Sequence, residues 1–103
     1  MKLIEKLSEK ISEEIHDARC YVRMAMEYRD EYPDMARTLY AISLEEMDHM
    51  SRLHNVVVDI IERYRKANGE PPASMMAVYD YLHKKQIDKA AEVKSMQDMY
   101  KAG

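Results

Sequence analysis

The chain has 103 residues, one cysteine and a formal net charge of −3, with acidic and basic residues interleaved along its length. That length suits a single domain, and the interleaved charges offer no clustered basic face of the kind that binds nucleic acids. No apolar run approaches the roughly 20 residues that span a bilayer, and one cysteine excludes an intrachain disulfide and a cysteine-based zinc or rubredoxin-type iron centre.

Three helices are expected in chain order. The first covers residues 3–31 and ends at Tyr32-Pro33-Asp34, because the residue before a proline is biased away from helical geometry. The second covers residues 34–66 or 34–67 and stops at Asn68-Gly69; after two prolines, the third covers residues 73–100. Residues 1–103 therefore form one all-α domain, in which a short turn makes the hairpin of residues 3–67 antiparallel.

Two stripes with helical spacing are apolar at nearly every step, and their polar members are residue types that bind metals. The first stripe consists of Ile4, Leu7, Ile11, Glu14, Ala18, Tyr21, Ala25, Tyr28 and Tyr32. The second consists of Met35, Leu39, Ile42, Glu46, His49, Leu53, Val56, Ile60 and Tyr64. Burying a carboxylate is costly unless it is paired or bound to a metal, so Glu14, Glu46 and His49 are candidate ligands.

The hairpin places these candidates at similar heights. Glu14 lies about 18 residues before the turn, and Glu46 and His49 lie about 13 and 16 residues after it, so a rise of 1.5 Å per residue puts them within roughly 3–8 Å along the axis. Tyr21 follows Glu14 by two turns, and we expect its hydroxyl to hydrogen-bond a liganding carboxylate. Core packing is an equally good interpretation of Tyr21.

A second copy of the chain is expected to complete the site. The third helix has a weaker apolar pattern, interrupted by Gln86 and Lys89, and it covers the stripes poorly. Two hairpins packed stripe to stripe would make a four-helix bundle with two copies each of Glu14, Glu46 and His49 on the two-fold axis. Glu46 is then expected to bridge two metals, with Glu14 and His49 as their terminal ligands. Carboxylate and imidazole ligands suit iron or manganese, and zinc also fits.

Two other interpretations stay open. The polar residues on the stripes can form a buried layer that fixes register in a structural or adaptor module for helical oligomerisation. Alternatively, the site holds zinc or manganese without redox chemistry. Glu13 with His16, Asp80 with His83, and His54 are interpreted as surface groups, and Cys20 as an inert, half-buried thiol.

At these residues the chain resembles the ferritin-like superfamily. Ferritins, bacterioferritins and rubrerythrins have a helix with a Glu and a neighbouring helix with Glu-x-x-His some thirty residues later, as at Glu14 and Glu46-x-x-His49. In ferritins and bacterioferritins a Tyr follows the first Glu by seven residues, like Tyr21. The resemblance covers roughly residues 3–67 and implies a di-iron centre with ferroxidase activity, which oxidises Fe(II) with oxygen or peroxide.

A single copy of this unit resembles the encapsulated ferritins, which have half a ferritin fold per chain and assemble the centre between two chains. Their acidic residues beside the first Glu correspond to Glu13, whereas His16 and Cys20 stand where that family has an acid and an aromatic residue. The resemblance leaves an encapsulin shell open as a partner, although residues 95–103 contain no targeting tail of that family's type. The N-terminal residues are not signal-like, and we expect a cytoplasmic homodimer or a multiple of dimers.

Overall fold

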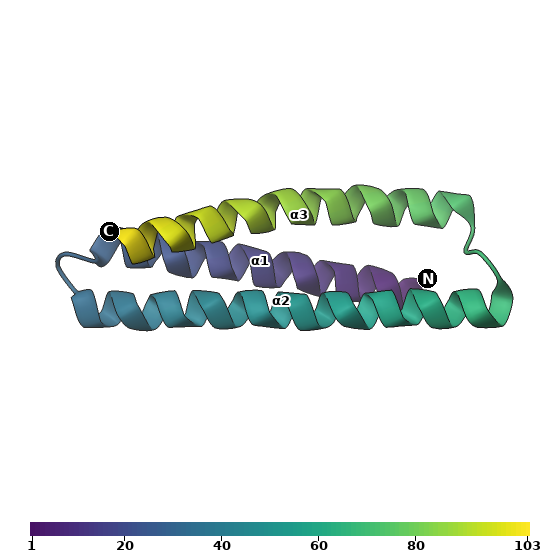
Figure 1. Ribbon diagram of the computed structural model, residues 1–103, viewed down its shortest axis with the longest axis horizontal. Coiled ribbons are helices and arrows are strands. Elements are labelled where there is room, and N and C mark those ends of the chain that lie inside the picture. Colours follow the sequence, from purple (N-terminus) through teal and green to yellow (C-terminus); the bar gives the residue numbers. More distant parts are fainter.

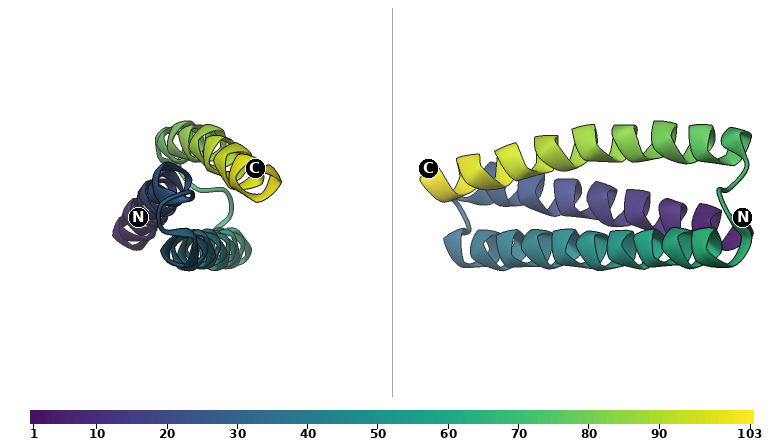
Figure 2. Two further views of the ribbon diagram at one scale, coloured as in Figure 1. Left: turned by 90° about the vertical axis from the view of Figure 1, so that its left-hand side faces the viewer. Right: turned by 45° about the vertical axis from the view of Figure 1, so that its right-hand side comes forward.

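The computed structural model describes residues 1–103 and contains three helices and no strands: α1 (Lys2–Tyr28), α2 (Pro33–Asn68) and α3 (Ala73–Ala102). The helices run side by side along a bundle of 56 × 20 × 18 Å (Figure 1). Viewed from the end, they lie at the corners of a triangle (Figure 2). The expectation of an all-α protein is thus confirmed. No helix combines the length and the apolar composition that crossing a lipid bilayer requires.

The helix ends differ from the sequence prediction by one to three residues. α1 ends at Tyr28 instead of Glu31, because the chain then forms a turn in which the amide of Tyr32 donates to the carbonyl of Tyr28 at 2.8 Å. Pro33 forces Tyr32 out of helical geometry (φ −132°, ψ 69°) and itself opens α2.

The two later helices each extend slightly beyond their predicted ends. α2 continues to Asn68 and ends at Gly69, whose φ of 79° favours glycine and whose amide donates to the carbonyl of Arg65 at 2.9 Å. α3 was expected to stop at Tyr100 but continues to Ala102, because no helix-breaking residue precedes Gly103. These shifts leave the antiparallel hairpin as predicted.

The buried stripe of α1 is offset from the predicted one. Its members are Ile4, Ser8, Ile11, Ile15, Ala18, Val22 and Ala25. Together with Val57 and Ile61 of α2 and Val93 of α3, the four apolar residues Ile4, Ile11, Ile15 and Ala18 form the core cluster. Leu7, Glu14, Tyr21 and Tyr28, which a second copy of the chain is expected to cover, are half-buried in the single chain, since α3 packs on the other side of α1.

Two glutamines attach α3 to the hairpin. Buried Gln86 donates from Nε2 to the carbonyl and hydroxyl oxygens of Ser8 and to Ser12 Oγ at 3.0–3.1 Å. Buried Gln97 donates to Ser43 Oγ at 2.9 Å, and Ser43 in turn donates to the carbonyl of Ala18 at 2.6 Å. Gln86, which seemed to interrupt the apolar pattern, therefore belongs to the contact. Satisfied polar groups at two levels fix the register of α3.

The side of the α1–α2 hairpin away from α3 remains uncovered, and we call it the open face. Its members come from the two predicted stripes and are half-buried or exposed: Leu7, Glu14, Tyr21 and Tyr28 of α1, and Leu39, Ile42, Glu46, His49, Leu53, Val56 and Ile60 of α2. Val56 is 45% exposed, although it is apolar. The candidate ligands thus lie on a largely apolar surface.

Candidate metal centre

Three of the predicted site residues lie together at mid-length of the hairpin, where α1 and α2 pack side by side. Glu14 comes from α1, and Glu46 and His49 lie one turn apart on α2. Each offers one ligand atom, and these atoms lie within 4.8 Å of one another. Nδ1 of His49 is 3.5 Å from Oε2 of Glu14. The arrangement follows from the antiparallel hairpin, because the short turn sets equal heights for positions that are 32 to 35 residues apart in the sequence.

Glu14 has a carboxylate oxygen without a hydrogen-bond partner. Its Oε2 is buried, and the contact with His49 lacks the geometry of a hydrogen bond. An unpaired buried carboxylate oxygen is costly, whereas a bound cation offsets that cost. The donor set of two carboxylates and an imidazole is one that iron, manganese or zinc accepts. The residues present therefore fit a divalent metal ion.

The proximity of Glu14 raises the pKa of Glu46. A hydrogen bond with Glu14 raises the pKa of Glu46 from 4.5 to about 7, with burial and the charge of Glu14 acting in the same direction and His49 opposing them. Near neutral pH, Glu46 is therefore protonated in part of the protein. A divalent cation can replace that proton, so metal binding at this site is expected to release protons.

The fourth predicted residue, Tyr21, is not part of this group. It is half-buried on α1, two turns beyond Glu14, and it belongs to the open face. Its proposed hydrogen bond to a liganding carboxylate remains a prediction.

The surface pair at Glu13 and His16 is exposed, as predicted. Glu13 pairs with Lys10 at 3.2 Å. Cys20 was expected to be half-buried, but it is exposed, with Sγ 3.6 Å from Nε2 of His16. The reason is the offset of the buried stripe, which turns residues 16 and 20 of α1 toward solvent.

The interpretation of His54 and His83 as surface groups is wrong. Both are half-buried, and their rings stack across α2 and α3 with centroids 4.7 Å apart. The burial of His54 could have been predicted from its spacing, because it lies three residues before buried Val57 and seven before buried Ile61, on the same side of α2. The analysis of α2 was centred on the stripe through His49, from which His54 points away.

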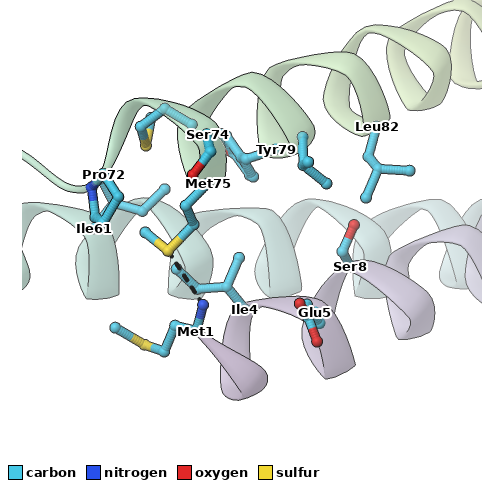
Figure 3. Close-up of a pocket in the computed structure, with 12 residues that line it drawn as sticks. Met1, Ile4, Glu5, Ser8, Ile61, Pro72, Ser74, Met75, Tyr79 and Leu82 are labelled. Atoms are coloured by element: carbon cyan, nitrogen blue, oxygen red, sulfur yellow. Dashed lines mark hydrogen bonds between the residues drawn. The ribbon is translucent and has the colours of Figure 1, made fainter.

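An apolar cavity of about 390 Å³ lies far from the candidate ligands, between the start of α1, the end of α2 and the start of α3 (Figure 3). Ile4, Ile61 and Met75 are among its lining residues, and the amino group of Met1 donates to Sδ of Met75 at 3.1 Å. Glu14, Glu46 and His49 do not line it. The candidate metal centre is therefore a feature of the open face and lies outside this cavity.

No protein-family model, curated protein or solved structure matches the chain. The resemblance to ferritin-like proteins accordingly rests on the identity and spacing of Glu14, Tyr21, Glu46 and His49.

Proposed function

We propose that this protein binds iron at a di-iron centre shared between two copies of the chain and oxidises Fe(II) there with oxygen or peroxide. The observation that carries the proposal is the unpartnered buried oxygen of Glu14, beside the carboxyl group of Glu46 and the imidazole of His49. A cation is the partner that this cluster of acceptors lacks.

The open face supports the need for a second copy. One chain supplies two carboxylates and one imidazole, which leave a metal ion short of ligands. Two copies packed through their open faces would supply four carboxylates and two imidazoles, and two divalent cations would neutralise the four carboxylates. The same packing would cover apolar surface that the single chain leaves exposed, such as Val56.

In the proposed dimer, Glu14, Glu46 and His49 of both copies would hold the ions, with the two Glu46 carboxylates shared between them. Bound Fe(II) would supply the redox chemistry, each ion giving one electron to the oxidant. Glu46, whose pKa is raised, would give up its proton on metal binding. The surrounding Leu39, Ile42 and Leu53 would exclude water from the site once a partner covers them.

Substitution of Glu46 tests the assignment. Glu46→Ala removes the bridging carboxylate and should abolish stoichiometric Fe(II) binding while leaving the helical content unchanged. Glu45→Ala is the matched control, because Glu45 immediately precedes Glu46 on α2 and is exposed. Equal iron binding by Glu46→Ala and the wild-type protein would refute the proposal.

The open face also favours a second candidate, a structural or adaptor module that oligomerises without metal. In that case Glu14, Glu46 and His49 form a polar layer that sets the register of the partners. The melting temperature and the oligomeric state would then not respond to Fe(II), Mn(II), Zn(II) or a chelator. A metal response without oxygen consumption would instead indicate a non-redox zinc or manganese site.

A further inference from the structure

A column of three rings joins α2 to α3 at mid-length. The imidazole of His54 on α2 stacks on that of His83 on α3, with centroids 4.7 Å apart and planes 7° apart. The ring of Tyr79 lies 5.6 Å from that of His83, also at 7°. Both histidines are half-buried. Parallel rings in this arrangement do not direct their nitrogen lone pairs at a common point, so the pair is poorly suited to hold a metal ion.

The cavity beside the pair has no charged residue in its lining. A cavity of about 360 Å³ lies against both imidazoles, and no carboxylate, lysine or arginine lines it. α1 contributes Ile11; α2 contributes Met50, Ser51 and Asn55; α3 contributes Gln86, Ile87 and Ala90. Tyr79 carries no charge at physiological pH, and burial, followed by the charge of Asp80, raises its pKa further. Asp80 is exposed.

The histidine stack joins α2 and α3, the pair of helices with the least contact in the fold. α3 lies mainly on α1, and Figure 1 shows its first half diverging from α2. The two ends of α3 differ in their attachments. Near its C-terminus, Gln97 bonds to Ser43, and Arg29 donates to the carbonyl of Tyr100 at 2.9 Å. In the first half, Gln86 bonds only to α1. The histidine stack is the contact between polar side chains of this half and α2, beside the apolar packing of Tyr79 on the core cluster.

We propose that the His54–His83 stack is a pH-sensitive latch, and that protonation of either imidazole releases the first half of α3 from α2. A proton on one ring places a cation against the other ring in a cavity without a carboxylate, and protons on both rings add direct repulsion. The bonds of Gln86 to α1 and of Gln97 to α2 remain, so α3 stays attached while its contact with α2 opens.

The direction of the pH dependence follows from burial. Burial, followed by the charge of His83, lowers the pKa of His54 from its usual value of 6.5. The open form therefore binds a proton more readily than the latched form. The latch is closed above about pH 6.5 and weakens as the pH falls below that value.

Amide hydrogen exchange on the wild-type protein at pH 7.5 and 5.0, corrected for the intrinsic exchange rates, tests the latch. We expect residues 79–87 of α3 and 51–57 of α2 to lose protection at pH 5.0. Residues 93–100 should keep it, because their attachments do not involve histidine. Equal protection of residues 79–87 at the two pH values would overturn the proposal.

A double variant separates protonation from packing. His54→Phe with His83→Phe keeps two stacked rings and removes both protonation sites, so its protection should not change with pH. His16→Phe is the matched control, because His16 is exposed on α1 and should leave the wild-type pH response intact. The same loss of protection in the double variant would assign the response to another group. If the double variant does not fold, His54→Asn with His83→Asn, which also removes both protonation sites, decides in the same way.

Discussion

Replacing Glu46 by Gln should stabilise the metal-free protein while destroying its proposed metal site. Gln keeps the shape of the side chain and removes the charge that conflicts with Glu14. In the wild-type protein, the raised pKa means that the folded chain binds a proton more tightly than the unfolded chain does. Stability from this group is fully present below about pH 4.5 and is lost as the pH rises through about 7.

The magnitude follows from the two pKa values. Since one pKa unit corresponds to 1.4 kcal/mol, a pKa of about 7 against the usual 4.5 sets a ceiling of about 3 kcal/mol at pH 8. The group lies on the open face, and access of solvent lowers the expected gain to about 1 kcal/mol. For a domain of this size, that gain raises the melting temperature by about 4–8 °C.

Thermal unfolding followed by circular dichroism, with chelator present, measures this effect at pH 5 and pH 8. Glu46→Gln should melt above the wild-type protein at pH 8 and close to it at pH 5. Glu45→Gln, whose carboxylate is exposed, should match the wild-type protein at both values. Addition of Fe(II) under nitrogen should then stabilise the wild-type protein and Glu45→Gln but not Glu46→Gln. A wild-type protein as stable as Glu46→Gln at pH 8 would refute the argued repulsion between Glu14 and Glu46.

Two further predictions concern the packing of the helices, and chemical denaturation checks both. Ser43→Ala leaves the buried amide of Gln97 without its acceptor and should cost about 1–3 kcal/mol, whereas Ser95→Ala, at an exposed position of α3, should change stability by less than about 0.5 kcal/mol. Ile11→Ala opens a cavity at a core residue that is 3% exposed and should cost about 2–5 kcal/mol; Ile87→Ala, at a position that is 53% exposed, should cost far less. Equal losses within either pair would contradict the described packing.

The hairpin and the grouping of the three candidate ligands could be predicted because both depend on local rules. Pro33 and Gly69 mark helix ends through their backbone restrictions, and a short turn sets the heights of Glu14, Glu46 and His49. These features need only the rise per residue and the helical period. They do not require knowledge of what packs against the hairpin.

The contacts of α3 could not be predicted in the same way. α3 has almost no apolar side of its own, and buried Gln86 and Gln97 looked like polar interruptions because their partners lie far away in the sequence. Only the packed structure shows that Ser8 and Ser43 accept their hydrogen bonds. The same uncertainty hid the burial of Ser8, Ile15 and Val22 on α1, each one residue beyond a predicted stripe position, and the stack of His54 on His83.

The most direct test of the proposed di-iron centre is an anaerobic titration of the metal-free protein with Fe(II), followed by admission of oxygen while absorbance and oxygen uptake are recorded. Sedimentation of the same samples gives the oligomeric state. The proposal predicts saturation at about one iron per chain in a dimer or a multiple of dimers, with oxidation faster than in the protein-free solution. Absence of stoichiometric binding, together with oxidation no faster than in that solution, would contradict it and make Glu14, Glu46 and His49 a polar layer of a helical module.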